Sequence, residues 1–375
     1  MDFNYSQEQY LMQDSALALF REIGGPPAAR RAYAEGAGVA RTLLPRLAEQ
    51  GLLGGPLSGD FGGSELSVLD FALVFEAAGR TLLPFPLAET FVVGTVLNAL
   101  ASDGQKHRHL ENINAGQTLA SVAWGATDKG VGFTGVEALT EGGVMRLYGR
   151  RTGVPFADAA DLLLVPVESK TGGGRLVALV NPHRDGMAIR RLESLDGSAP
   201  LSVVDFQGYE LADDDQIWDG EPAWTLSVNI GRVAYAQEAL GVAEQVFADT
   251  VEYVKVREQF GFPVGRFQAV KHTAADDFLL VESARVANRY AALMATEASV
   301  DAPLHIMMAK AYSGDMARRV TSDAIQLHGG IGYTWDADVH LFFKRAWRLA
   351  SQLGTPVALR EEMAVRVIDA RRHAG

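Results

Sequence analysis

The chain has 375 residues, of which 48% are hydrophobic and 21% charged, the balance of a folded protein with more than one ordinary core. Its formal net charge of −12 argues against a nucleic-acid partner, because affinity for a phosphate backbone comes from clustered Lys and Arg. The lack of cysteine excludes disulfides, thiolate nucleophiles and cysteine-based metal sites.

Neither a metal site nor a membrane segment is predicted. The eight histidines lack His-x-x-x-His spacing, and we interpret His107 with His109, and His340 near two aspartates, as solvated surface segments. The chain start has no basic and apolar leader, and no apolar run reaches the roughly 18 residues of a membrane span. We therefore expect a cytoplasmic protein.

The first region has helical patterns. Ser6 and Gln9 have the spacing of a capping box ahead of an apolar-periodic stretch that reaches Phe20. Further helices are predicted over residues 40–53, 66–83 and 87–110.

The pattern becomes β-rich from about residue 118. Strands are predicted over residues 144–148, 162–167, 176–180 and 201–206, separated by turns rich in Gly, Pro and Asp. This spacing favours an antiparallel barrel or sandwich, and no G-x-G-x-x-G follows a strand, so a Rossmann nucleotide site is not expected.

Long helices return after residue 222. Val233, Leu240, Phe247 and Val254 are spaced by seven and form one apolar face, on which Gly241 allows close approach of a neighbouring helix. Further helices are predicted over residues 269–298, 303–327 and 356–372. The sequence thus predicts three domains, a helical one over 1–117, a β domain over 118–218 and a helical bundle over 219–375.

Two motifs carry functional information. The first is Arg257-Glu258-Gln259-Phe260-Gly261, followed by Gly265-Arg266-Phe267-Gln268, where a guanidinium and an aromatic ring suit a pyrophosphate and a base. The second is the run from Ile325 to Thr334, where a helix ends in Gly-Gly-x-Gly and can expose backbone groups to a ligand. Each motif alone also fits an ordinary helix end.

Together, in this order and after a β-rich region, the motifs resemble the acyl-CoA dehydrogenase family. The resemblance covers essentially the whole chain, including the opening helix and the Phe61-Gly62-Gly63 loop. It implies an α+β fold with an N-terminal helical domain, a middle β-barrel and a C-terminal four-helix bundle, usually in tetramers. It also implies FAD as cofactor, an acyl-CoA substrate that loses hydrogens from its α and β carbons, and an electron-transfer flavoprotein as electron acceptor.

The resemblance also implies which residues bind FAD. The residues that match the family's FAD contacts are Arg257, Gln259, Phe260, Gln268, Gln326, Gly329, Gly330 and Thr355. In this family the first of these reach the flavin of a neighbouring subunit, so an oligomer is expected. Arg232 and Gly354 match positions at the substrate.

The family's catalytic base is missing from both positions where members carry it. The base takes the α proton, which requires a carboxylate within hydrogen-bond reach. The usual Tyr-Glu-Gly-Thr stretch falls on Gln352-Leu353-Gly354-Thr355, and the alternative Glu-Arg pair falls on Gly231-Arg232. No catalytic residue is therefore assigned.

Other departures fall in the same cavity. The family's flavin loop corresponds to residues 121–127, and its flavin-shielding Trp falls on Gly153. Glu238 and Asp336 are candidates for a relocated base.

Four hypotheses follow. The leading one is a subunit that keeps the flavin-binding residues but lacks the base. It is paired with a catalytic paralogue, in a heterotetramer rather than a homo-oligomer. The alternatives are a self-sufficient enzyme with a relocated base, a flavin monooxygenase on the same fold, and a non-catalytic structural subunit.

Overall fold

The computed structural model describes residues 4–125, 131–170, 174–218 and 220–373. Contacts divide the chain into two compact units. The bundle unit comprises residues 1–29, 68–83 and 232–375, and the sheet unit comprises residues 30–67 and 84–231. The helices that precede the strands are therefore shared between the two units. No helix within the described ranges has the length and apolarity that crossing a membrane requires.

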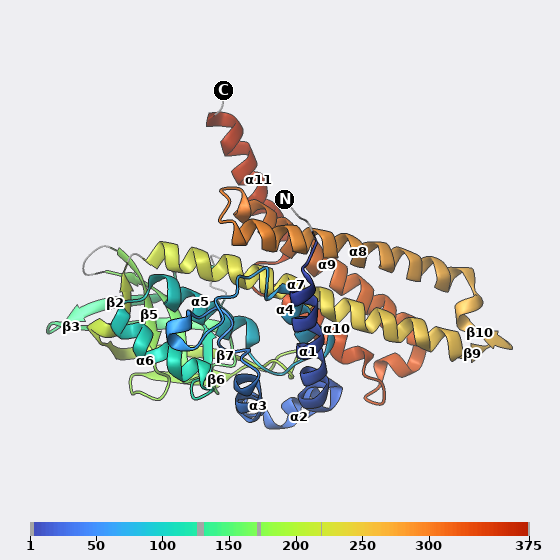
Figure 1. Ribbon diagram of the computed structural model, residues 1–375, viewed down its shortest axis with the longest axis horizontal. Helices are drawn as coiled ribbons and strands as arrows, with labels where there is room; N and C mark the ends of the chain where they lie inside the picture. The colour runs from blue at the N-terminus through green and yellow to red at the C-terminus, as the bar shows by residue number, and fades with distance from the viewer. Residues whose placement is uncertain (1–3, 126–130, 171–173, 219, 374–375) are drawn as a thin grey trace. The chain divides into compact units, whose positions relative to one another are not determined.

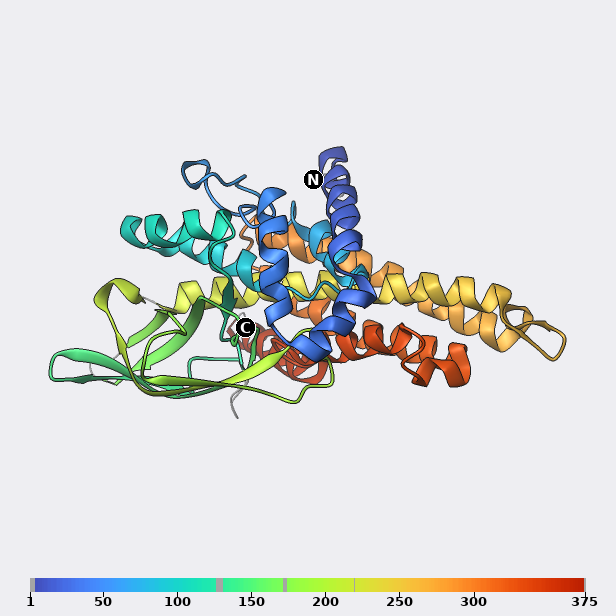
Figure 2. The same ribbon diagram turned by 90° about the horizontal axis from the view of Figure 1, so that it is seen from below.

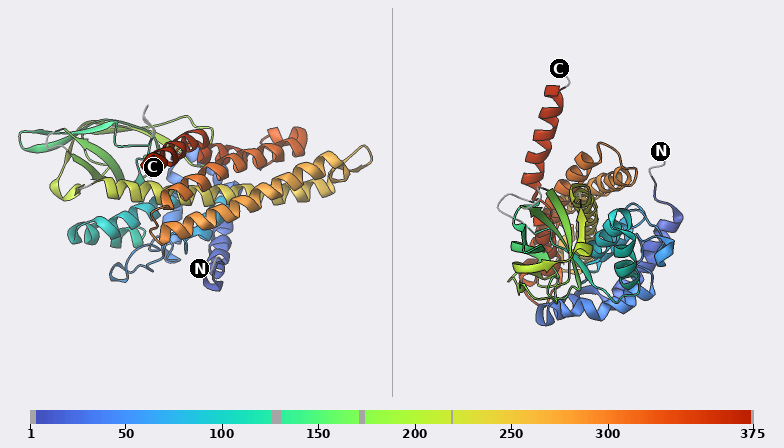
Figure 3. Two further views of the ribbon diagram at one scale, coloured as in Figure 1. Left: turned by 90° about the horizontal axis from the view of Figure 1, so that it is seen from above. Right: turned by 90° about the vertical axis from the view of Figure 1, so that its left-hand side faces the viewer.

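Long helices dominate the bundle unit (Figure 1). Its elements are α1 (Gln7–Ile23), α4 (Ala72–Arg80), α7 (Gly220–Val256, from residue 232), β9 (Glu258–Gln259), β10 (Phe262–Pro263), η3 (Val264–Arg266), α8 (Gln268–Thr296), α9 (Ala302–His328), η4 (Gly329–Tyr333), α10 (Val339–Ser351) and α11 (Pro356–His373). In Figure 3, α8 and α9 run side by side. A buried polar chain joins three helices, because Asn288 donates to the Ala236 carbonyl at 2.9 Å and accepts from the Ser313 hydroxyl at 2.7 Å.

Two sequence predictions for the bundle unit are confirmed. Ser6 and Gln9 form a reciprocal capping box at the start of α1. Gly241 lies against α4 so closely that a Cβ there would be 1.9 Å from the Glu76 carbonyl oxygen. Gly79 of α4 makes the matching approach, since its Cβ would be 2.0 Å from the Glu238 carbonyl oxygen. The two helices can cross at this distance only because both positions are glycine.

The sheet unit contains eight strands in one sheet, visible in Figure 2, together with short helices. The strand order is β6-β7-β3-β2-β4-β5-β8, with β1 paired to β4. The elements are α2 (Gly25–Glu35, from residue 30), α3 (Gly38–Glu49), η1 (Gly59–Phe61), α5 (Leu87–Leu100), α6 (Asp103–Asn114), β1 (Ala120–Val122), β2 (Val136–Glu141), β3 (Val144–Pro155), β4 (Leu162–Ser169), β5 (Gly174–Val180), β6 (Met187–Arg191), β7 (Leu201–Leu211), η2 (Asp213–Asp215) and β8 (Gln216–Trp218).

The sheet differs from the predicted antiparallel arrangement in two pairs. Strands β1 and β2 both pair with β4 in parallel, whereas the remaining pairs of the sheet are antiparallel. Closure of the sheet into a barrel is not among the pairings of the described residues. The four predicted strands correspond to β3, β4, β5 and β7, which are the longest ones.

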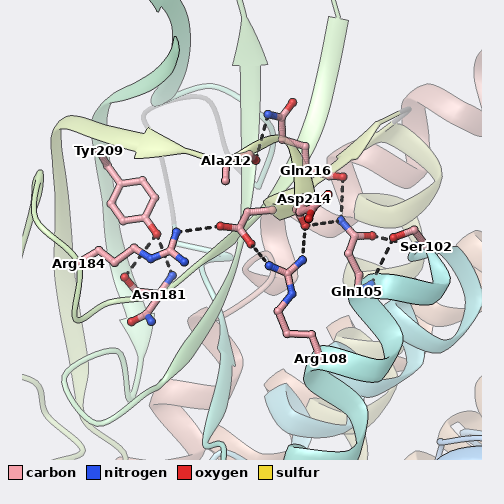
Figure 4. Close-up of polar contacts among 10 residues, drawn as sticks. Ser102, Gln105, Arg108, Asn181, Arg184, Tyr209, Ala212, Asp214 and Gln216 are labelled. Carbon is pink, nitrogen blue, oxygen red and sulfur yellow. Dashed lines mark hydrogen bonds and ion pairs between the residues drawn. The ribbon is translucent and has the colours of Figure 1, made fainter.

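The buried carboxylate of Asp215 links α6 to the end of the sheet through ion pairs (Figure 4). Asp215, which follows β7, accepts from Arg108 of α6 at 3.0 Å and from Arg184 at 2.9 Å. The Gln105 amide donates to the carbonyls of Asp214 and Gln216, both at 3.0 Å. A carboxylate bound by two guanidinium groups is a stable way to bury a charge.

Two helical predictions are wrong in detail. The single helix predicted over 87–110 is split into α5 and α6, because Ser102 forms a capping box with Gln105 and starts a new helix. Helix α10, which begins at Val339, was not predicted. The helix predicted over 66–83 is shorter and covers only α4.

Candidate functional site

The first motif lies on the connection between α7 and α8. Arg257 follows α7, Gln259 and Phe260 lie in the β9–β10 hairpin, and Gln268 begins α8. All four side chains are exposed, and Phe260 is 89% exposed with a left-handed φ of 55°. Within the described residues, no ion pair engages the Arg257 guanidinium. This group is therefore available to an anionic ligand.

The second motif ends α9 close to the first motif. Gln326, Gly329 and Gly330 are exposed, and Gly329 has a φ of 67° that turns the chain into η4. The Tyr253 hydroxyl donates to the His328 carbonyl at 3.2 Å, and the two rings stack at 4.3 Å. Because Tyr253 is in the last turn of α7, both motifs lie at one end of the bundle unit, which we call the open end.

The open end has the chemistry of a nucleotide site. A Cβ added at Gly329 or Gly330 would meet no heavy atom within 4 Å, so the backbone of this turn faces free space. Exposed amides of a glycine turn and a free guanidinium both suit a pyrophosphate. An adjacent exposed aromatic ring suits a planar base. The residues present therefore fit the diphosphate part of a dinucleotide.

The structure does not place Thr355 at the open end. Its hydroxyl accepts from the Ala358 amide at 3.2 Å and caps α11. Leu359 of α11 packs against Met307 and Ala311 near the start of α9. At 1.5 Å per residue, Ala311 lies about 22 Å along α9 from Gln326. Within one chain, Thr355 and the open end are thus separate parts of the predicted flavin site.

Leu353, one of the two predicted base positions, lies at the connection between α10 and α11. Leu353 is 2% exposed and adopts a left-handed φ of 58°. Arg232, which directly follows Gly231 in α7, donates from Nε to the Leu353 carbonyl at 3.1 Å. Its Nη2 forms an ion pair with Glu362 of α11 at 3.1 Å. Arg232 thus has two protein partners that fix this connection.

Gly354 is required for the same turn. It has a φ of 107°, and a Cβ there would be 2.9 Å from the Leu359 side chain. The residue that sequence reasoning placed at the substrate therefore has a structural reason to be glycine.

A buried lysine next to this connection was missed by sequence reasoning. Lys310 of α9 is 1% exposed, and its Nζ donates to the Leu349 carbonyl at 2.8 Å. Burial, and secondly the charge of Arg232, lower the pKa of Lys310 to about 7. Its apolar helical neighbours Ile306 and Met307 were the only sequence signal for its burial. We call the group formed by Arg232, Lys310, Leu349 and Leu353 the closed corner.

The two candidate replacement acids have different surroundings. Glu238 accepts from Nη1 of Arg345 at 2.8 Å, and Arg345 is 1% exposed. Its carboxylate therefore neutralises a buried cation. Asp336 is exposed, and its backbone amide donates to the Thr334 hydroxyl at 3.3 Å.

The two segments of the sheet unit that match the family's flavin contacts pack directly on each other. A Cβ at Gly125 would be 2.2 Å from the Thr152 carbonyl, next to Gly153. Trp124 is 1% exposed and donates to the Ser227 hydroxyl at 2.8 Å. Positions 126 and 127 of the predicted loop lie outside the described residues.

Comparisons with known proteins agree with this architecture. The N-terminal-domain model of acyl-CoA dehydrogenases matches residues 6–117, and the C-terminal-domain model matches residues 219–368. The acyl-CoA dehydrogenase IpdE2 of Mycolicibacterium smegmatis is 31% identical over 353 residues, covering 94% of this chain and 96% of the relative.

Solved structures show the same fold. The ChsE4–ChsE5 complex from Mycobacterium tuberculosis has a chain that superposes with a TM-score of 0.89 at 24% identity, with 98% of this chain and 99% of that chain covered. A variant of the Tcur3481–Tcur3483 steroid ACAD superposes with a TM-score of 0.87 at 26% identity, with the same coverage. The chain therefore belongs to the acyl-CoA dehydrogenase family, whose members are oxidoreductases that use FAD.

Proposed function

We propose that this chain is the base-lacking subunit of a heteromeric, cytoplasmic acyl-CoA dehydrogenase. It binds the flavin nucleotide at its open end, and a paralogous chain supplies the carboxylate that takes the α proton of the thioester. The observation that carries this proposal is the closed corner, where a buried leucine occupies the base position. Arg232 donates to the carbonyl of this leucine, and Lys310 donates to the nearby Leu349 carbonyl.

Removal of the α proton needs a free carboxylate within hydrogen-bond reach of the substrate. Leu353 cannot accept a proton. Glu362, the carboxylate that Arg232 brings to this corner, forms ion pairs with both Arg232 and Arg366. Glu238 forms an ion pair with the buried Arg345. Both Glu362 and Glu238 therefore have a cationic partner.

The residues of the open end support the proposal that this chain binds FAD. Bound FAD would supply the hydride acceptor, and an electron-transfer flavoprotein would then collect the electrons. Arg257 would hold the pyrophosphate, with Gln259, Gln268 and Gln326 as amide partners and the Gly329–Gly330 turn beneath it. An exposed half-site of this kind fits a flavin that is shared with a second chain.

Two observations favour a partner that differs from this chain. The Tcur3481–Tcur3483 and ChsE4–ChsE5 structures are both named for two chains, which is the kind of assembly we propose here. In the sheet unit, Trp124 is buried and Gly125 packs against Thr152, so the two segments that match the family's flavin contacts pack on each other. A partner with an open flavin face would complete the site.

Purification of the full chain alone and with a catalytic paralogue tests the proposal. We expect the complex to show flavin absorbance and to oxidise acyl-CoA with an electron acceptor, and the single chain to show no turnover. Oxidation of acyl-CoA by the single chain would refute the proposed division of labour.

A matched pair of arginine variants locates the nucleotide contact. Arg257→Ala in the complex should lower flavin occupancy, because a charge-assisted contact to the pyrophosphate is lost. Arg266→Ala is the control, since Arg266 lies in the same connection but stacks on Phe262, with its guanidinium carbon 4.1 Å from the ring centroid. Equal flavin loss in both variants would argue against Arg257 as a specific contact.

A further inference from the structure

Aromatic side chains reach the surface where α9, η4 and α10 meet in the bundle unit. Helix α10 packs against α9, and Phe342 and Leu349 are among its buried residues. Phe343 and Trp347 lie one turn apart beside this buried set, with ring centroids 5.8 Å apart. Trp347 is 38% exposed, and Phe343 is partly exposed. The packing of α10 therefore leaves two aromatic rings partly in solvent.

The turn after α9 adds two further rings to this region. Gly332 packs so closely on α9 that a Cβ there would be 2.7 Å from the Ile325 carbonyl oxygen, a contact that glycine permits. The next residue, Tyr333, is 76% exposed, and Trp335 is 55% exposed. The Lys344 ammonium of α10 lies 4.4 Å from the Trp335 ring centroid. The aromatic face, as we call this surface, consists of Tyr333, Trp335, Phe343 and Trp347.

A pocket of about 370 Å³ lies within the aromatic face. Its walls include Tyr333, Trp335 and Phe343, together with Ser322 of α9. The volume is in the range of pockets that hold a ligand. Lys344 brings a positive charge to the wall, and no carboxylate is among the described residues that line the pocket. The pocket therefore suits an apolar group that lies beside a negative charge.

The composition of the aromatic face is typical of a protein–protein interface. Trp, Tyr and Arg supply much of the binding energy at such interfaces, and exposed apolar patches mark interaction sites. Arg318 of α9 belongs to this surface, since its guanidinium carbon lies 4.0 Å from the Trp347 ring centroid. Tyr333 and Trp335 extend into solvent and do not enclose the pocket. These features favour a protein partner over a small molecule.

The aromatic face is continuous with the open end. Gly330 and Tyr333 belong to the same short helix η4 and are three residues apart, about 6 Å along its axis. The proposed function, on which this step rests, has a second chain share the flavin at the Gly329–Gly330 turn. A chain that reaches this turn also covers Tyr333.

We propose that the aromatic face is the docking site of the catalytic paralogue. One apolar side chain of the paralogue occupies the pocket, and an acidic side chain of the paralogue lies next to Lys344. Burial of the Tyr333 and Trp335 rings supplies much of the association free energy. The face holds the paralogue, while Arg257 and the glycine turn hold the nucleotide.

The dissociation constant of the full chain and its purified paralogue, measured by titration calorimetry, tests the proposal. Tyr333→Ala and Trp335→Ala should each raise this constant about tenfold or more, because each removes a ring that the complex buries. Both side chains are exposed, so folding should persist. Tyr10→Ala is the matched control at a 46% exposed ring of α1, and it should change the constant by less than about twofold.

A second pair of variants tests the pocket without removing a ring. Ser322→Phe fills the pocket from the α9 side and should weaken association about tenfold or more. Ser322→Ala keeps the pocket open and removes only a hydroxyl that donates to the Arg318 carbonyl at 2.6 Å. Its dissociation constant should match that of the wild type.

Wild-type dissociation constants for Tyr333→Ala, Trp335→Ala and Ser322→Phe would overturn the proposal. Self-association of the single chain that Trp335→Ala abolishes would identify a second copy as the occupant and exclude the paralogue. Failure of the wild-type chain to bind the paralogue would refute the proposed function together with this docking site.

Flavin occupancy at saturating paralogue separates docking from nucleotide binding. In the Trp335→Ala complex it should return to the wild-type value, because the excess of paralogue compensates for the weaker association. A deficit that persists at saturation would place Trp335 in the nucleotide site and overturn its role in docking.

Discussion

The open end and the closed corner differ in how their polar groups are used. At the open end, Arg257, Gln326 and the Gly329–Gly330 turn face solvent. At the closed corner, Arg232 and Lys310 are buried and donate to backbone carbonyls of the α10–α11 region. The first surface can accept an external ligand, whereas the cationic groups of the second already have partners within the protein.

Under the proposed function, this difference separates the two tasks of an acyl-CoA dehydrogenase site. Nucleotide binding needs exposed donors, and these remain at the open end. Proton abstraction needs a free carboxylate, and here the matching position is a buried leucine. Variants at the two places should therefore affect different measurements.

The largest effect on stability is expected for Glu238→Leu. The substitution leaves Arg345 buried without its carboxylate, which should cost about 3–5 kcal/mol in the free energy of unfolding measured with urea. Glu252→Leu is the control, because its ion pair with Lys255 is exposed and contributes roughly 0–1 kcal/mol. Unchanged stability combined with lost acyl-CoA oxidation would instead identify Glu238 as a relocated base and break the comparison.

Two glycines provide the next contrast. Gly241→Ala places a Cβ 1.9 Å from the Glu76 carbonyl oxygen, so α4 and α7 must separate, with an expected loss of about 1–3 kcal/mol. Gly330→Ala adds a methyl group to open space and should change the free energy of unfolding by less than about 0.5 kcal/mol. Thermal or urea unfolding of both variants measures this. A similar loss in both would show that the open end is packed more tightly than its glycines indicate.

The regular periodicities allowed much of the fold to be predicted from sequence. Val233, Leu240 and Val254 marked α7, and the Ser6 capping box marked α1, because both patterns follow from local helix geometry. The parallel pairing of β2 with β4 could not be predicted, since it depends on long-range contacts that leave no local pattern.

The site was predictable only in part for the same reason. Motif spacing identified Leu353 and Gly231 as base positions. It did not show that Arg232 holds the Leu353 carbonyl or that Lys310 lies beside it, because those contacts join residues 121 and 39 positions apart. The ion pair between Glu238 and Arg345 could not be predicted from the sequence for the same reason. Glu238, two turns from Gly231, was therefore considered as a relocated catalytic base.

Lys310 makes the closed corner sensitive to pH. Because its pKa is lowered in the folded chain to about 7, the unfolded chain binds one more proton between that value and the ordinary pKa of lysine. The stability contribution of this group should therefore rise with pH across that window, by up to about 1.4 kcal/mol per pH unit.

Lys310→Met should remove this rise, so the unfolding free energy of the variant relative to wild type should fall as pH increases above about 7. Urea titrations at several pH values measure the difference. Lys271→Met, at an exposed position of α8, is the matched control and should keep the wild-type slope. A Lys310→Met slope equal to that of wild type would show that the lysine is hydrated and the corner not closed.

The smallest effect on stability, and the sharpest separation of the two regions, is expected for Phe260→Gly. Phe260 is 89% exposed in a left-handed conformation, so glycine relieves backbone strain while it adds freedom to the unfolded chain. These effects oppose each other, and the net change should stay within about 0.5 kcal/mol. Flavin occupancy of the complex should nevertheless fall, because the proposed function has this ring pack on the nucleotide. Leu11→Ala, another exposed apolar side chain, should change neither quantity. Since Phe260 contributes little to folding, a loss of flavin without a loss of stability would locate its role in binding, whereas unchanged flavin occupancy would remove it from the nucleotide site.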